Sequence, residues 1–164
     1  ARLCNAFGMH VIGVDGRRKG MPEGVAEMHL PESLDDLLPR ADFVIMTIPH
    51  TPTTEGLMDQ GRLRRMKRTA FLINIWRGMT VHLDDLVAAL EAGEISGAGL
   101  DVFEIEPLPP EHPLWSTPNV LITPHTAGFG PYLDDRRLDI LLENCRRFAH
   151  GEPLRNIVDK ATWF

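Results

Sequence analysis

The stretch 97–109 reads GAGLDVFEIEPLP and decides the fold. It opens as a short apolar run, which predicts a buried strand, and continues into a proline-rich loop that carries Asp101 and Glu106. Open α/β sheets place their chemistry at the carboxyl ends of the strands. The stretch therefore predicts a functional site where this strand ends.

The rest of the chain alternates apolar strands with helices. Strands are predicted at 9–14, 28–30, 42–48, 69–75, 96–100 and 120–123. Helices are predicted at 1–7, after Ser33, at 54–58, 59–66, 84–90 and 131–149. Continuously apolar strands that alternate with helices are typical of an α/β fold with a parallel sheet covered on both faces.

Composition narrows the class of protein. The chain has 164 residues, 43% of them hydrophobic and 24% charged, which is ordinary for a single globular domain. A net charge of −6 argues against a nucleic-acid partner, and no apolar run approaches the roughly 18 residues of a membrane span. Cys4 and Cys145 form neither a disulfide framework nor a metal-binding pattern. We expect them to be buried or half-buried thiols in a cytoplasmic protein without a metal site.

Charged side chains and an imidazole follow three different strands of the predicted sheet. Arg77 follows the strand at 69–75, Asp101 and Glu106 follow the strand at 96–100, and His125 follows the strand at 120–123. The carboxyl ends of parallel strands share one edge, so we expect these residues to converge there. The alternative is a set of unrelated surface-loop residues.

Five sequence blocks resemble one known family in their order and spacing. They are the Phe7-Gly8-Met9 turn with Asp15, the segment 49–54 (PHTPTT), the segment 74–78 (NIWRG), the segment 99–108 (GLDVFEIEPL), and the segment 123–128 (TPHTAG). The chain resembles the cofactor domain of the D-isomer-specific 2-hydroxyacid dehydrogenases. This resemblance implies a Rossmann-like, doubly wound parallel sheet.

The resemblance assigns three catalytic positions. Arg77 matches the arginine that grips the substrate carboxylate and polarises its carbonyl, as a planar guanidinium is suited to do. His125 matches the acid/base that exchanges a proton with the substrate oxygen. Glu106 matches the carboxylate partner of this histidine, which stabilises the imidazolium form.

The resemblance also assigns contacts with a nicotinamide cofactor. Asp15 matches the acid that binds the adenosine ribose, which favours NAD, while the neighbouring Arg17 and Arg18 leave NADP open. Asp101 matches the residue that binds the nicotinamide carboxamide; from the residues alone, an acid that caps a helix or a loop is an equal alternative. The further cofactor contacts implied are Pro49, Thr51, Ile75, Trp76, Ala127 and Gly128. The family usually has a small residue in place of Trp76, and the indole either shapes the pocket or packs outward.

The glycine-rich phosphate loop of the family, Gly-x-Gly-x-x-Gly, does not occur in the sequence. We therefore expect residues 1–130 to form a partial dinucleotide-binding domain, incomplete at its N-terminal side, that binds cofactor poorly alone. The absent strand is expected between the strands of Val11 and Ile73, so that two sheet edges stay unpaired. Residues 131–164 are expected to form a crossover helix and tail on the side of the substrate domain.

The function implied for the parent protein is NAD(P)-dependent oxidation and reduction at the CH–OH group of D-2-hydroxy acids. Glyoxylate, hydroxypyruvate or a phosphorylated 2-oxo acid are candidate substrates, and a homodimer is implied. Two alternatives stay open: a non-catalytic, NAD-binding corepressor-like protein, and the remnant of a truncated gene. Glu104, on the same loop as Glu106, is expected to face solvent.

Overall fold

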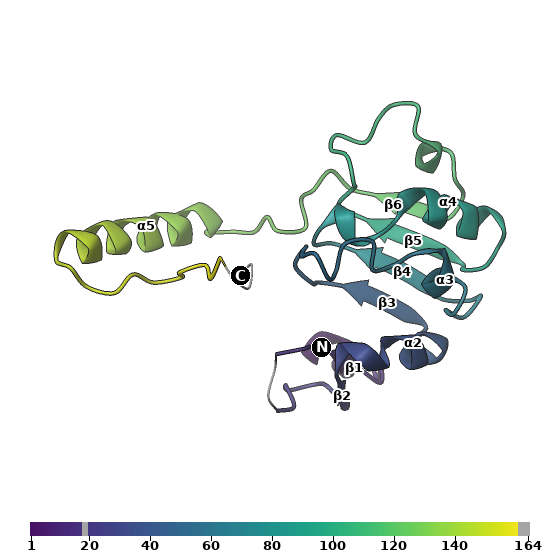
Figure 1. Cartoon of the computed structure of the whole chain (residues 1–164), viewed down its shortest axis with the longest axis horizontal. Helices are drawn as coiled ribbons and strands as arrows, with labels where there is room; N and C mark the ends of the chain where they lie inside the picture. The colour runs from purple at the N-terminus through teal and green to yellow at the C-terminus, as the bar shows by residue number, and fades with distance from the viewer. Residues whose placement is uncertain (18–19, 161–164) are drawn as a thin grey trace.

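The computed structural model describes residues 1–17 and 20–160 and contains two parallel sheets (Figure 1). The larger sheet has the strand order β3-β4-β5-β6, with bounds Phe43–Met46, Phe71–Asn74, Gly97–Leu100 and Val120–Ile122. Asn74 lies opposite Leu100, and Leu100 lies opposite Ile122, so these strands end at one level. The predicted parallel α/β architecture is confirmed.

The smaller sheet pairs β1 (Ile12–Val14) with β2 (Glu27–His29). It lies beside α1 (Arg2–Ala6) and α2 (Leu34–Leu37), below β3 in Figure 1. Glu27 holds this region together, because its carboxylate contacts His10 at 2.6 Å, His29 at 3.0 Å and Arg40 at 2.5 Å. Hydrogen bonds from Arg40 first, and then from the two histidines, lower the pKa of Glu27 to about 2.

The core lies between one face of the larger sheet and the helices α3 (Gln60–Leu63) and α4 (Leu83–Glu91). Leu72 from β4, Leu63 from α3 and Leu86 from α4 are all fully buried. Short 3-10 turns complete the covering loops: η1 (Pro31–Ser33), η2 (Leu38–Arg40), η3 (Gly78–Thr80) and η4 (Pro113–Trp115).

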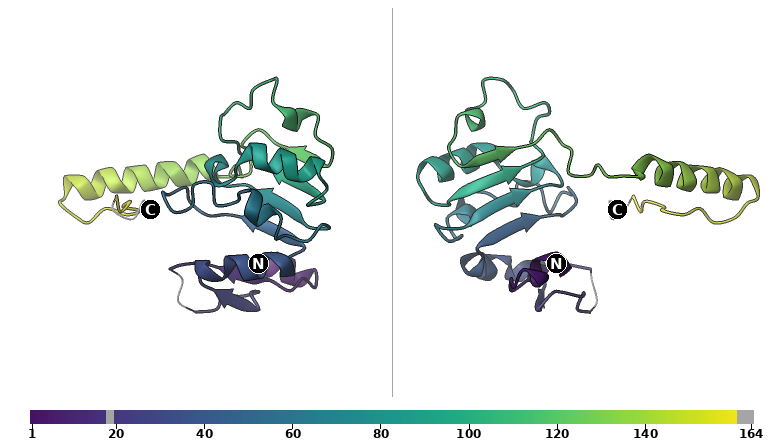
Figure 2. Two further views of the ribbon diagram at one scale, coloured as in Figure 1. Left: turned by 45° about the vertical axis from the view of Figure 1, so that its right-hand side comes forward. Right: turned by 180° about the vertical axis from the view of Figure 1, so that it is seen from behind.

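The opposite face of the larger sheet is open, which corrects the prediction of a sheet covered on both faces. No helix of the described part of the chain packs on this face, and the strands lie uncovered when seen from behind (Figure 2). Phe43 and Phe71 stack there with their ring centroids 5.8 Å apart, and Leu121 is 69% exposed. An apolar hollow of about 430 Å³ lies over these side chains.

The position of the free sheet edge also corrects the prediction. Ile73 lies on β4, which is paired on one side with β3 and on the other with β5. The strand with a free edge, on the side toward the N-terminal region, is therefore β3.

Helix α5 (Leu133–Ala149) projects away from the sheets at the end of an extended segment (Figure 1). None of its residues is buried, and the apolar side chains Leu138, Leu141, Leu142 and Phe148 are more than half exposed. Cys145 lies on this helix and is exposed, so the expectation of a buried or half-buried thiol is wrong for Cys145; Cys4 is partly buried.

Local hydrogen bonding explains two other differences. The predicted helix at 54–58 is absent and Met58 forms a β-bridge with Val81. The Thr54 hydroxyl donates to the Pro49 carbonyl at 2.6 Å and accepts from the Thr51 amide at 2.8 Å, which gives the backbone an alternative to a helix. Ser33 precedes α2, but its side chain makes no capping hydrogen bond because a 3-10 turn already runs into the helix.

Across residues 1–17 and 20–160, the structure contains no helix with the length and apolar character needed to cross a membrane.

Candidate active site

Glu106 and His125, which are 19 residues apart in the sequence, meet at the carboxyl edge of the larger sheet. Glu106 comes from the loop after β5 and His125 from the turn after β6. Glu106 Oε2 lies 2.7 Å from His125 Nδ1, and Glu106 Oε1 accepts a hydrogen bond from the Phe103 amide at 3.0 Å. The predicted contact between these two side chains therefore forms.

The protonation state of Glu106 fixes the direction of this hydrogen bond. Partial burial alone would raise the pKa of Glu106, but the hydrogen bonds from His125 and Phe103 and the charge of His125 outweigh burial and lower it. An ionised carboxylate has no proton to donate, so His125 Nδ1 is the donor. The imidazole then has Nε2 left for other chemistry, on a side chain that is 51% exposed.

Asp101 shapes the turn that carries His125. The His125 backbone has φ of +53°, a left-handed conformation that costs a non-glycine residue about 1–3 kcal/mol. The turn is held because the His125 amide donates to the Asp101 carbonyl at 2.8 Å, and the amides of Thr126 and Ala127 donate to the Asp101 carboxylate at 2.9 and 2.7 Å. The Thr123 hydroxyl also donates to this carboxylate.

Asp101 itself is buried, with 2% of its surface exposed. Burial would raise its pKa, but the hydrogen bonds from Thr123, Ala127 and Thr126 more than compensate and lower it. These contacts are those of the loop-capping acid that the sequence left as one alternative. The role of Asp101 toward nicotinamide stays a prediction.

The turn that carries Arg77 is held by two buried polar residues on either side of it. Asn74, at the end of β4, donates from Nδ2 to the Arg77 carbonyl at 2.9 Å, and the Thr80 hydroxyl donates to the same carbonyl at 2.7 Å. The Arg77 side chain lies over the indole of Trp76, 5.4 Å from the ring centroid, and donates from Nη1 to the Trp76 carbonyl at 2.6 Å. The indole thus packs against the Arg77 side chain and remains partly exposed to solvent.

Arg77 and the Glu106–His125 pair lie at the same sheet edge and are linked through backbone. In the described part of the chain, no hydrogen bond or ion pair joins the Arg77 side chain to Glu106 or His125. The link is Gly78, which packs directly on the Phe103 carbonyl and leaves no room for a Cβ atom.

Four residues that support the site were not assigned a role from the sequence: Asn74, Gly78, Thr80 and Glu104. The expectation that Glu104 faces solvent is wrong, because its Oε2 accepts the backbone amide of Leu83 at 3.0 Å at the start of α4. Asn74 and Gly78 were visible in the sequence. The partners of Asn74 are local, at Arg77 and Thr80, whereas Phe103, on which Gly78 packs, is remote in sequence.

The sequence model of one protein family, the D-isomer specific 2-hydroxyacid dehydrogenase, NAD binding domain, matches residues 1–127 of the chain. The chain belongs to this family.

Relatives of the dehydrogenase family cover nearly all of the chain. The chain is 39% identical to a glyoxylate reductase of Korarchaeum cryptofilum over 161 residues. The aligned region covers 98% of this chain and 48% of the reductase. Among solved structures, an NADPH-dependent glyoxylate/hydroxypyruvate reductase from Sinorhizobium meliloti, in complex with NADP and sulfate, is 36% identical with a TM-score of 0.88. The match covers 100% of this chain and 52% of the Sinorhizobium meliloti reductase chain.

A second solved structure is similar at the same level. A D-isomer specific 2-hydroxyacid dehydrogenase from Xanthobacter autotrophicus Py2, in complex with NADPH and MES, is 41% identical with a TM-score of 0.86, over 96% of this chain and 64% of that one. The chain spans about half the length of the curated relatives it matches.

Most of the remaining cofactor positions proposed for this dehydrogenase-family chain follow strands of the larger sheet, whereas Asp15 follows β1 of the smaller sheet. Pro49 and Thr51 belong to the hydrogen-bonded loop after β3, and Ile75 follows β4. Gly128, beyond the His125 turn, has open space around it. Asp15 follows β1 and accepts the Arg17 amide at 2.8 Å, while Arg18 lies outside the described residues.

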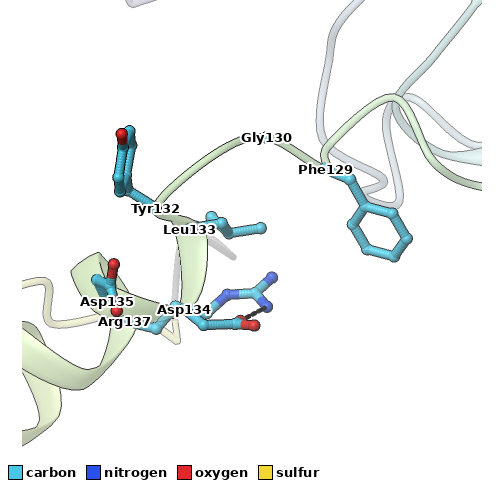
Figure 3. A pocket seen from close by; sticks show the side chains of 7 residues that line it. All are labelled: Phe129, Gly130, Tyr132, Leu133, Asp134, Asp135 and Arg137. Atoms are coloured by element: carbon cyan, nitrogen blue, oxygen red, sulfur yellow. Dashed lines mark hydrogen bonds and ion pairs between the residues drawn. The ribbon is translucent and has the colours of Figure 1, made fainter.

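A hollow of about 400 Å³ lies away from these residues, where the extended segment meets α5 (Figure 3). It is lined by Phe129, Gly130, Tyr132, Leu133, Asp134, Asp135 and Arg137, and none of the dehydrogenase site residues contributes to it. Within the described ranges, no group of three or more His, Cys, Asp or Glu side chains is arranged to hold a metal ion.

Proposed function

We propose that the protein to which this chain belongs is an NAD(P)-dependent oxidoreductase that interconverts small 2-oxo acids and D-2-hydroxy acids. Glyoxylate and hydroxypyruvate are its first candidate substrates, as the names of the relatives suggest. The observation that carries the proposal is the 2.7 Å contact of His125 with an ionised Glu106 at the sheet edge that also bears Arg77.

In this proposal His125 is the acid/base. Glu106 accepts from Nδ1 and so orients the ring with Nε2 away from the carboxylate. An imidazolium held in this way donates its Nε2 proton to the carbonyl oxygen as the 2-oxo acid is reduced, and the neutral ring takes the proton back in the oxidation.

Arg77 is the substrate anchor. Its guanidinium has five N–H donors in a planar fork, and the contact with the Trp76 carbonyl engages Nη1. The fork matches the geometry of a carboxylate, which two parallel hydrogen bonds can hold. The Trp76 ring beneath the guanidinium restricts its orientation, because the cation is attracted to the indole face.

The bound nicotinamide cofactor supplies the hydride. Asp101, Ile75, Trp76, Ala127 and Gly128 would face its nicotinamide end, as the open space beside Gly128 permits. Pro49 and Thr51 would line its middle, and Asp15 would bind the adenosine ribose. No residue of this chain is assigned to the pyrophosphate, because the sequence has no Gly-x-Gly-x-x-Gly. NAD and NADP both stay open, since the similar solved structures hold NADP or NADPH.

The organisation of the whole protein is part of the proposal. Residues 1–130 form part of the dinucleotide-binding domain, and residues 131–164 return toward the substrate domain. Helix α5, none of whose residues is buried and whose apolar side chains are largely exposed, supports this division because such a helix requires a partner surface. A cytoplasmic homodimer is the proposed state, and light scattering coupled to size exclusion measures it.

Two polypeptides test the activity: the 164-residue chain, and the longer, full-length protein to which we propose that it belongs. Oxidation of NADH and NADPH is followed with glyoxylate and hydroxypyruvate. We expect turnover only in the longer protein. His125→Gln should lower kcat by about 100- to 10,000-fold. Arg77→Gln should raise KM about tenfold or more, because a charge-assisted hydrogen bond is lost.

A matched control is Arg68→Gln, which removes an exposed guanidinium before β4, at the opposite end of that strand from Arg77, and should leave the kinetics unchanged. The proposal is overturned if the longer protein binds the cofactor without reducing any 2-oxo acid. Specific capture of other proteins by such an inactive, NAD-bound form would favour the corepressor-like alternative.

A further inference from the structure

We infer that Glu104 is a positioning residue, which ties the loop after β5 to the start of α4 and thereby holds Glu106 against His125. Its importance for turnover rests on the proposed function. The contacts themselves are a property of the chain.

The first contact is with a helix end that has no cap of its own. The N-cap residue of α4, His82, makes no side-chain capping hydrogen bond. Glu104 Oε2 accepts the Leu83 amide at 3.0 Å and so satisfies one of the unpaired donors of the first turn. A carboxylate is also the group favoured at the positive end of a helix dipole. Glu104 therefore caps α4 from 21 residues away in the sequence.

The helix end is a rigid anchor. Leu83 and Leu86 bury their side chains in the core against the sheet. On the outer side, His82 Nδ1 lies 3.8 Å from Glu104 Oε1, and the His82 ring packs so closely on Gly56 that a Cβ atom there would overlap it. The Glu104 carboxylate thus lies between the start of α4, where the Leu83 side chain is buried, and the partly exposed imidazole of His82.

Between Phe103 and Leu108, the loop after β5 has no buried apolar side chain. Phe103 and Leu108 are buried, but Ile105 between them is 66% exposed. Between those two buried side chains, the loop is fixed to the rest of the molecule by the carboxylates of Glu104 and Glu106.

Glu104 is connected to the site through the backbone of the residue before it, Phe103. Phe103 precedes it, and the Phe103 amide donates to Glu106 Oε1 at 3.0 Å. The Phe103 carbonyl packs on Gly78, the residue after Arg77. Release of Glu104 from α4 therefore loosens the Glu106 contact first and the support of the arginine turn second.

The test reads the imidazole tautomer of His125 by NMR of its ring nitrogens, detected through the carbon-bound ring protons. It uses the 164-residue chain at a pH above the usual histidine value of about 6.5. The ring signals are assigned by comparison with His125→Gln. In the wild type, Glu106 should hold the Nδ1-protonated form. The tautomer population in Glu106→Gln serves as the reference for a weakened contact between residue 106 and His125.

Glu104→Ala should shift the tautomer population toward that of Glu106→Gln. Glu104→Gln keeps an oxygen that accepts the Leu83 amide and should restore the wild-type population. Glu111→Gln changes an exposed glutamate further along the loop and should have no effect. A lost cap that only lowers overall stability would leave the tautomer of the folded protein unchanged.

The inference is overturned if folded Glu104→Ala keeps the wild-type tautomer population. If Glu104→Ala does not fold, Glu104→Asp replaces it: the carboxylate is kept, but one methylene less draws it away from Leu83. A wild-type tautomer population in folded Glu104→Asp then overturns the inference.

The catalytically complete protein gives a second readout. There Glu104→Ala should lower kcat at least tenfold with KM for the 2-oxo acid nearly unchanged, and Glu104→Gln should recover most of kcat. If the complete protein has no reductase activity at all, the proposed function fails, while the tautomer result still decides whether Glu104 positions the pair.

Discussion

Gly78 packs against the carbonyl group of Phe103 with no space for a side chain between them. The two residues belong to loops that follow different strands, one carrying Arg77 and the other Glu106. This backbone contact sets the separation between the arginine turn and the Glu106–His125 pair. A small residue at position 78 is therefore a geometric requirement of the site.

Gly78→Ala should be strongly destabilising. Its Cβ atom would overlap the Phe103 backbone, which cannot rotate away as a flexible side chain could. We expect a loss of about 3 kcal/mol in the free energy of unfolding, at the upper end for overpacked sites, measured by urea denaturation. Gly130→Ala is the control, because that position faces open space. Equal stabilities of the two variants would contradict the packing argument.

Asp101→Asn should loosen the turn of His125. Both carboxylate oxygens of Asp101 accept hydrogen bonds, and an amide nitrogen in place of one would face the N–H donor of Thr126 or Ala127. An unsatisfied buried donor costs about 1–3 kcal/mol. The amides of Thr126 and Ala127 should exchange faster with solvent deuterium. Asp134→Asn, on exposed α5, should change neither stability nor exchange; unchanged exchange in Asp101→Asn would refute this account.

Glu27 should make the small sheet sensitive to acid. Its pKa falls from the ordinary 4.5 to about 2 in the folded protein, so its contribution to stability is complete above 4.5 and is lost as pH falls toward 2. In unfolding experiments over this pH range, the difference between the wild type and Glu27→Gln should shrink as pH decreases. Added salt should reduce the difference, since Glu27 is accessible to solvent. Glu32→Gln is the exposed control, and a constant gap between wild type and Glu27→Gln would rule out this role.

Trp76 should report binding of a small carboxylate to Arg77. The guanidinium lies over the indole, so a ligand that draws it away alters the surroundings of an exposed tryptophan. Titration with glyoxylate should change the fluorescence of the chain without cofactor. The change should disappear in Trp76→Phe, which keeps Trp115 and Trp163, and in Arg77→Gln. The same response in all three proteins would show that the carboxylate acts elsewhere.

Features that depend on local sequence were predicted well. The alternation of apolar runs with helices gave the parallel sheet, and the strand ends brought Glu106 and His125 together as expected. Glu104 and Gly78 were missed because their partners, Leu83 and Phe103, are more than 20 residues away in sequence and are ordinary apolar residues. The covering of the sheet was predicted wrongly because an apolar strand such as β3 is compatible with a packed face or an open one; composition does not distinguish them.

The open face of the larger sheet also affects how the chain behaves at high concentration. Phe43, Ile45, Phe71 and Leu121 present apolar surface to water across this face, which extends to the free edge of β3. An unpaired edge strand offers its backbone amides and carbonyls to any other extended chain, and apolar surface beside it strengthens such an encounter. We therefore expect the 164-residue chain to aggregate as its concentration rises, and a lysine in place of Ile45 to keep it dispersed.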